Sequence, residues 1–361
     1  MLELADIFRA AGPHYREAHA GQLLPSHRRA MDDIVACRTS VLGGSLYACD
    51  DCGALDYAYH SCRNRHCPTC QEERAQEWLD RVRQRLLPCD HYLLTFTLPQ
   101  QLRAVARTHQ AVVYAMLLRE AAASVQTLAA DPTWVGGPPG ILAVLHTWTR
   151  TLEYPPHAHL LVTAGGLARD GRAWRKPTHP RFLLPGYALS PIFRAKMRDA
   201  LARAGLAQDI DPLVWSRDWV VHGQQIGRGA QAGAHAARYL ARYVYHVALT
   251  NHRLETFEHG RVTFRYTHGR THETRHLTLP VDAFITRFLQ HVLPRGFTKI
   301  RYYGLLSPTN RTDLERARHL LDLHAVAATA PASDTAGVAE QTLVMEPVAL
   351  PVVRCCPVCQ R

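Results

Sequence analysis

The segments ILAVLHTWTR (141–150) and HAHLLVTAG (157–165) decide the fold, because both are rich in residues that favour strands. Only TLEYPP (151–156) lies between them, so we predict that they pair as an antiparallel hairpin. His157 and His159 are two residues apart, which puts both imidazoles on one face of the sheet, and His146 lies on the facing strand. Three such imidazoles could bind a divalent ion and leave positions open for water or a phosphate oxygen. The alternative is a chance HxH pattern in a chain with 22 histidines.

The rest of the chain alternates between helical and strand-like segments, which predicts an α+β fold with an antiparallel sheet flanked by helices. Further strands are expected at 91–99 and 218–223, and VTFRYTHG with THETRHLTL (262–279) predicts a second hairpin. Helices are expected within 1–36 and at 71–87, 101–129, 190–204, 234–249 and 281–292, with a short one after Arg311. The Ala/Pro-rich stretch 325–351 is typical of a linker.

Length and charge narrow the class of protein. The 361 residues are enough for two or three domains, which we place at 1–88 (helical and zinc-binding), 89–311 (the histidine and tyrosine region) and 312–361 (linker and cysteine-containing tail). No run of about 18 apolar residues predicts a membrane span, and the first residues do not resemble a signal peptide. A cytoplasmic protein is therefore expected. The formal net charge of +11 favours a polyanionic partner such as DNA.

Six of the ten cysteines lie between Cys37 and Cys70, which in a reducing compartment indicates metal binding rather than disulfides. Cys49-x2-Cys52 and Cys67-x2-Cys70 have the spacing of a structural zinc site with four thiolates. Three neighbours are possible further ligands, of the same or a second ion: Cys37, Cys62 and His66. The terminal Cys356-x2-Cys359 is half a site, which either joins Cys355 or a distant partner around another zinc ion or binds nothing.

Basic residues near these motifs are candidate DNA contacts. Arg63 and Arg65 stand between the cysteines, and Arg238 and Arg242 lie in a predicted helix. That helix also carries Tyr239 and Tyr243, whose i, i+4 spacing places both phenols on one face. Such a pair is commonly core packing. A phenolate can also attack a phosphodiester and form a covalent phosphotyrosine, provided that a metal stabilises the charge on the phosphate.

These motifs occur in a specific order, and together they resemble a known family. HAH at 157–159 followed by YLARY at 239–243 resembles the HUH (His-hydrophobic-His) single-strand endonucleases, with Ala158 as the middle residue. CRTSVLGGSLYACDDCG, SCRNRHCPTCQ and RFLQHVLPRGFTKIRYYGLL extend the resemblance over nearly the whole chain. With a zinc-binding segment before the HUH domain, the chain is similar to the rolling-circle transposases of the insertion sequence 91 family.

The resemblance implies a mechanism and its site residues. It implies an HUH nuclease that cuts single-stranded transposon ends with Tyr239 and Tyr243, leaves a 5′-phosphotyrosine and a free 3′-OH, and attacks target DNA. It also implies Mg²⁺ or Mn²⁺ bound by His157, His159 and a third ligand, in addition to the structural Zn²⁺. His146 is the expected third ligand, and Glu153 is its competitor because some HUH enzymes use Glu or Gln there. Such a protein is expected to be associated with the nucleoid.

Three alternatives remain open. A plasmid replication initiator or relaxase would use the same nickase chemistry on other DNA. A non-catalytic zinc-dependent DNA-binding protein would hold HAH and YLARY as core residues. A metallohydrolase would cut with water and leave no covalent link to the protein, although the chain has no HExxH signature.

Overall fold

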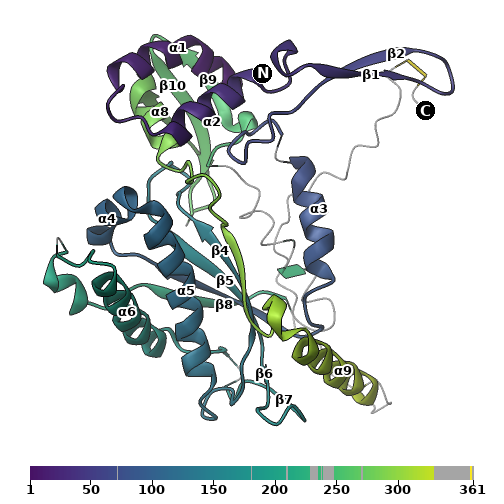
Figure 1. Ribbon diagram of the computed structural model, residues 1–361, viewed down its shortest axis with the longest axis vertical. Helices are drawn as coiled ribbons and strands as arrows, with labels where there is room; N and C mark the ends of the chain where they lie inside the picture. Colours follow the sequence, from purple (N-terminus) through teal and green to yellow (C-terminus); the bar gives the residue numbers. More distant parts are fainter. Residues whose placement is uncertain are drawn as a thin grey trace.

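The computed structural model describes residues 1–70, 72–179, 181–208, 210–227, 235–236, 238, 248–269, 271–328 and 358–359. Its centre is a five-stranded antiparallel sheet with the strand order β12-β4-β5-β3-β8 (Figure 1). The strands are β3 (His91–Thr97), β4 (Gly140–His146), β5 (His157–Thr163), β8 (Val221–Gln225) and β12 (Ile300–Gly304). The predicted α+β class and the predicted pairing of the two histidine-bearing strands are confirmed.

Strand β4 is shorter than predicted, because the chain turns at Thr149. The Leu152 amide donates to the Thr149 carbonyl, the Thr149 amide donates to the Glu153 carbonyl, and Leu152 has a φ of 62°. Pro155 and Pro156 have no amide hydrogen for a longer ladder. Ten residues (147–156) therefore connect the strands, and the ladder ends with His146 opposite His157.

Helices cover both faces of this sheet, which explains why β4 is buried along its whole length and β5 at every position after His157. On one face lie α4 (Arg103–Thr108), α5 (Gln110–Ala129) and α6 (Gly186–Arg203), packed against Leu145, Ala158 and Leu160. On the other face lie α3 (Glu72–Arg83) and α9 (Arg311–Ala328) (Figure 1). Helix α9 extends three residues past the predicted start of the linker; residues 329–351 lie outside the described part of the chain.

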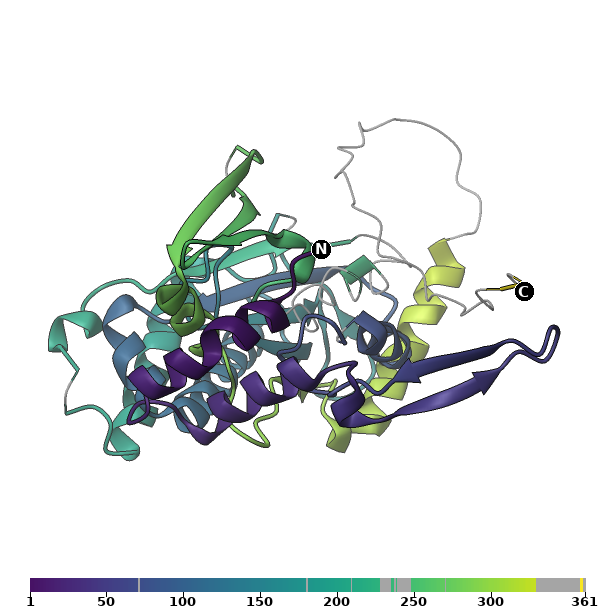
Figure 2. The same cartoon turned by 90° about the horizontal axis from the view of Figure 1, so that it is seen from above.

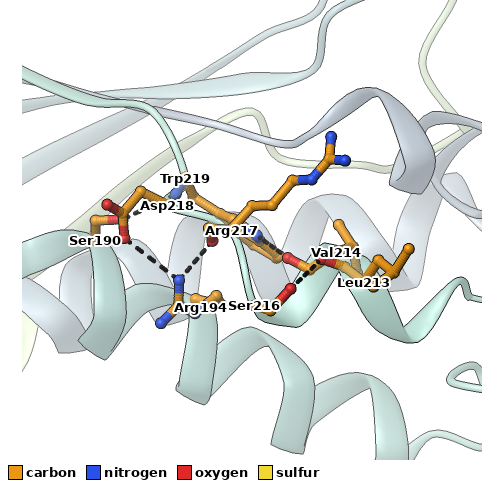
Figure 3. A network of polar contacts seen from close by, with 8 residues as sticks. All are labelled: Ser190, Arg194, Leu213, Val214, Ser216, Arg217, Asp218 and Trp219. Atoms are coloured by element: carbon orange, nitrogen blue, oxygen red, sulfur yellow. Dashed lines mark hydrogen bonds and ion pairs between the residues drawn. The ribbon is translucent and has the colours of Figure 1, made fainter.

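A polar network joins α6 to the segment before the edge strand β8 (Figure 3). The Trp219 amide donates to Ser190 Oγ over 2.9 Å, and the Trp219 indole donates to the Val214 carbonyl over 3.0 Å. Arg194 donates to the Arg217 carbonyl. These bonds fix the approach of the chain to β8, whose partner is β3.

A second core lies at the top of the molecule in Figure 1 and is built from both halves of the sequence. Helices α1 (Leu4–Ala18) and α2 (Pro25–Ala36) pack with α8 (Val281–Leu289) and a three-stranded sheet, β11-β10-β9. Its strands are β9 (Leu254–Glu258), β10 (Arg261–Thr267) and β11 (Thr274–Pro280), so the second predicted hairpin is confirmed. Phe8 and Phe288 meet edge to face, with ring centroids 5.6 Å apart.

Two small hairpins complete the fold. Strands β6 (Gly166–Leu167) and β7 (Trp174–Arg175) pair below the main sheet. Strands β1 (Gly44–Ala48) and β2 (Leu55–Tyr59) form a hairpin that projects from the body of the molecule, as Figure 2 shows. In the described part of the chain, no helix has both the length and the apolar character needed to cross a bilayer.

One buried histidine of β3 gives a prediction about pH. The His91 side chain is fully buried, and burial lowers its pKa to about 4. As the pH falls below about 6.5, the unfolded chain takes up a proton that folded His91 does not accept until about pH 4, so the folded state loses stability over that interval. When the pH is lowered from 7 to 5, the free energy of unfolding should fall in both proteins. In His91→Leu it is expected to fall by about 2 kcal/mol less than in the original chain. Urea unfolding at the two pH values measures the difference; equal losses would contradict the prediction.

Candidate functional site

The end of the β4–β5 ladder brings three histidines together. His146 Nδ1 lies 2.9 Å from His157 Nε2, and His157 Nε2 lies 3.1 Å from His159 Nε2. Two ligands at right angles around a metal about 2.1 Å away are about 3.0 Å apart, so each of these two nitrogen pairs has the spacing of neighbouring ligands on an octahedral ion. Three nitrogen ligands on one side leave the opposite side for water or a phosphate oxygen. The three ring nitrogens, all within 4.8 Å of one another, therefore form a candidate site for a divalent ion.

The surroundings keep these imidazoles neutral, as metal ligands must be. Burial lowers the pKa of His146 and His157, and it lowers the pKa of His159 to about 3. The other two histidines, Lys299 and His291 add a smaller electrostatic contribution at His146. Each ring therefore has a lone pair available at neutral pH.

Neighbouring groups orient two of the rings through the nitrogen that faces away from the cluster. His157 Nδ1 lies 2.7 Å from the Pro155 carbonyl, and His159 Nδ1 lies 3.0 Å from Thr95 Oγ1 on β3. Such outer contacts fix the ring and its tautomer in metal sites. Thr95 is a positioning residue that the sequence reasoning missed. Its signal was the strand register, since Thr95 pairs with His159.

The competing third ligand lies elsewhere. Glu153 is exposed in the loop between β4 and β5 and does not belong to the histidine cluster. His146 belongs to it because it ends β4 directly opposite His157. The geometry thus favours the three-histidine set.

Tyr239, Tyr243 and Arg242 lie outside the described residues, but nearby Ala236 is described. Ala236 is fully buried against the sheet in a cluster with Leu142, Val144 and Leu161. Val144 pairs with His159 and Leu142 with Leu161, so these apolar residues share the face that carries the histidines. Ala236, three residues before Tyr239, is therefore part of the hydrophobic core on the histidine face of the sheet. Arg238 is half-buried beside it.

A small cavity lies at Leu145 and Thr147, the residues on either side of His146 in the sequence, and both basic and apolar side chains line it. It has a volume of about 10 Å³, and its lining includes Arg65, His66, Thr147, His291 and Lys299. Burial, with a contribution from Arg65, lowers the pKa of Lys299 to about 7. Lys299 is thus a buried amine that can gain a proton when an anion approaches.

The cysteines form two clusters, which corrects the predicted grouping. The Sγ atoms of Cys37, Cys62, Cys67 and Cys70 lie within 4.8 Å of one another, and Cys62 and Cys70 are 3.8 Å apart. A tetrahedral Zn²⁺ with bonds of about 2.3 Å separates its sulfurs by about 3.8 Å. Backbone amides also donate to sulfur here, from Cys62 to Cys37 and from Asn64 to Cys62. This set has the geometry of a closed, structural zinc site.

Cys49 and Cys52 are not part of that set, although the sequence analysis grouped them with Cys67 and Cys70. They lie in the turn that joins β1 to β2, next to Cys359. A strand of five residues is about 16 Å long, which separates the turn from the base of the hairpin. The alternating segments SLYA and LDYAY around CDDCG were the sequence signal for this hairpin.

The remaining predicted residues near the cysteines have mixed placements. His66 is half-buried, and its Nε2 accepts a hydrogen bond from the Leu293 amide; it is not grouped with the cysteines. Arg65 donates to the carbonyls of Phe297 and Pro294, which ties the zinc segment to the loop before β12. Arg63 is exposed, on a backbone with φ of 55°.

Known protein families match both the cysteine-containing segment and the region that carries the histidines. Residues 7–98 match the family model described as "Transposase zinc-binding domain", and residues 140–313 match the one described as "Putative transposase". The chain is 37% identical to "Putative transposase y4qJ" of Sinorhizobium fredii, over 99% of this chain and 93% of that protein. It is 29% identical to "Transposase for insertion sequence element IS801" of Pseudomonas savastanoi pv. phaseolicola, over 76% of this chain and 68% of that protein. No solved structure matches.

These matches define the class of the protein: it is a DNA-processing enzyme of the transposase class, with a zinc-binding segment before the sheet that carries the three histidines. The chain is a member of the transposase family of the insertion sequence 91 type.

Proposed function

We propose that this transposase cuts and joins single-stranded DNA at the ends of its element through a 5′-phosphotyrosine. The observation that carries the proposal is the histidine cluster, in which three ring nitrogens lie 2.9 and 3.1 Å apart on one sheet face. A divalent ion bound by His146, His157 and His159, Mg²⁺ or Mn²⁺, would polarise the scissile phosphate and offset its developing charge. The neutral state of the three histidines and the spacing of their nitrogens fit such an ion.

The residues of the chain have separate roles in this reaction. A phenol of Tyr239 or Tyr243 loses its proton and attacks phosphorus, the bond from phosphorus to the 3′ oxygen breaks, and the 3′ oxygen takes up a proton. The 5′ phosphate remains on the tyrosine, and the 3′-OH is free to attack it again or to prime synthesis. The burial of Ala236, three residues before Tyr239, in the same hydrophobic cluster as Leu142, Val144 and Leu161 supports this assignment.

Other charged and metal-binding groups would hold the DNA and the fold. Lys299, with a pKa lowered to about 7, gains a proton as a phosphate approaches and then neutralises part of its charge. Arg63, Arg238 and Arg242 are candidate contacts for the backbone of the strand. We assign the structural Zn²⁺ to Cys37, Cys62, Cys67 and Cys70, which have the spacing of a closed tetrahedral site.

The direct test is incubation of the purified protein with labelled single-stranded oligonucleotides from the ends of its element, in Mn²⁺, followed by denaturing electrophoresis. We expect a labelled band at the size of the protein that is lost with EDTA and in Tyr239→Phe/Tyr243→Phe. The two single variants then identify the nucleophile, and Tyr187→Phe, an exposed tyrosine of α6, is the matched control.

The other outcomes point to the alternatives. Cleavage without a labelled protein band would indicate attack by water and contradict the role of the tyrosines. Binding without cleavage or adduct, on a correct end sequence, would indicate a protein that only binds DNA. Equal activity on an unrelated plasmid origin would favour a replication initiator or relaxase.

A further inference from the structure

The last described residues of the chain meet the turn of the β1–β2 hairpin. The Sγ atoms of Cys49, Cys52 and Cys359 lie within 4.8 Å of one another, and those of Cys49 and Cys359 are 3.6 Å apart. The short C-terminal segment, yellow in Figure 1, lies at the far end of the hairpin. The fold thus brings the thiol of Cys359 next to those of Cys49 and Cys52, although Cys49 and Cys359 are 310 positions apart in the sequence.

The sulfur spacing fits a metal ion and does not fit a disulfide. A disulfide bond is about 2.05 Å long, whereas two thiolates on a tetrahedral Zn²⁺ are about 3.8 Å apart. The value of 3.6 Å is close to the 3.8 Å between Cys62 and Cys70 in the first cluster. The two clusters therefore have similar sulfur geometry.

The backbone of the β1–β2 turn holds Cys49 and Cys52 close together. The Cys49 amide donates to the Ala54 carbonyl over 2.9 Å, and the Gly53 amide donates to the Cys49 carbonyl over 2.8 Å. Gly53 has a φ of 72°, a conformation that glycine adopts without strain and that lets the chain reverse directly after Cys52. Both cysteines are thereby held on a tight loop with their sulfurs close together.

The hairpin also lacks the packing that stabilises other parts of the fold. It is a separate two-stranded sheet, and Leu46, Tyr47 and Leu55 on it are 55–67% exposed. An isolated two-stranded hairpin is only marginally stable in water. A metal bound at the turn and to the tail would supply the missing restraint, as metals do in small domains with little core.

We propose that Cys49, Cys52 and Cys359 bind a second Zn²⁺, which fastens the C-terminal tail to the tip of the hairpin. Each thiol loses its proton on binding. The three described thiolates carry the proposal. The proposal concerns a structural site and is independent of the nicking reaction.

Zinc content tests it. The full-length protein, purified under reducing conditions and desalted, is expected to contain two zinc ions per chain. Inductively coupled plasma mass spectrometry measures the zinc content. Cys359→Ser and Cys49→Ser/Cys52→Ser are each expected to contain one. The matched control is Cys89→Ala, a buried cysteine outside both clusters, which is expected to keep two. One zinc ion in the original chain, or two in Cys359→Ser, would overturn the proposal.

A second measurement separates loss of the site from general unfolding. Cys359 lies at the end of the chain and belongs to no hydrophobic core cluster of the described residues, so its replacement should leave those cores intact. Hydrogen exchange is expected to accelerate at least tenfold in the hairpin peptide 44–59 of Cys359→Ser and to be unchanged in β4 and β5. Unchanged exchange in the hairpin, or a Cys49–Cys359 cross-link that only a reductant releases, would contradict a metal site.

Discussion

Replacing His157 or His159 with alanine is expected to lower the rate of single-strand nicking by about 10³-fold or more. The physical reason is the loss of a metal ligand, since a bound ion contributes several kcal/mol to stabilising the charge of the reacting phosphate. Because both rings lie in the buried end of the β4–β5 ladder, no other histidine of the described residues is in position to replace them. Nicking assays with Mn²⁺ measure the rate, and calorimetric titration with Mn²⁺ measures the metal affinity.

Two further variants make this result specific. Thr95→Val removes the hydroxyl beside His159 Nδ1 but keeps the ligands, so metal affinity should fall about 10- to 100-fold and excess Mn²⁺ should restore nicking. Excess Mn²⁺ should not restore His159→Ala. His14→Ala, an exposed histidine of α1, is the matched control. Nicking by His157→Ala or His159→Ala at the original rate would show that the cluster is not the catalytic metal site.

Replacing Cys67 with serine is expected to remove one zinc ion and to unfold the N-terminal part of the protein. Cys37, Cys67 and Cys70 belong to the same buried core as α1, α2 and α8, so the metal links the zinc segment to residues far along the chain. Zinc binding to four cysteines contributes on the order of 10 kcal/mol in small domains, and its loss leaves buried thiols without their ligand role.

The melting temperature of Cys67→Ser is expected to fall by about 10 °C or more. The conversion is about 2–4 °C for each kcal/mol of lost stability in a folding unit of about 150–250 residues. Calorimetry measures it, and hydrogen exchange in α1 and α2 should rise while exchange in α5 stays slow. Cys89→Ala should lower the melting temperature by only a few degrees, since it removes one buried sulfur and no metal ligand. A Cys67→Ser protein with its full zinc content would refute the assignment.

The main sheet was largely predictable because its signals are local. Apolar, strand-forming segments with period-two histidines identify β4 and β5 and their shared face from the residues alone. The grouping of cysteines was not predictable in this way. Spacing indicates that a Cys-x2-Cys pair binds metal, but it does not say which other cysteines share the ion with that pair.

The sequence by itself determined the class of this protein: an α+β fold with a zinc-binding segment followed by a transposase domain. Only the tertiary structure decided which residues meet. It placed Thr95 behind His159, Lys299 close enough to His146 to affect its pKa, and Cys359 at the hairpin turn. The physical reason is that side-chain periodicity acts within about ten residues, whereas these contacts depend on strand register and on core packing between segments 64 to 310 positions apart.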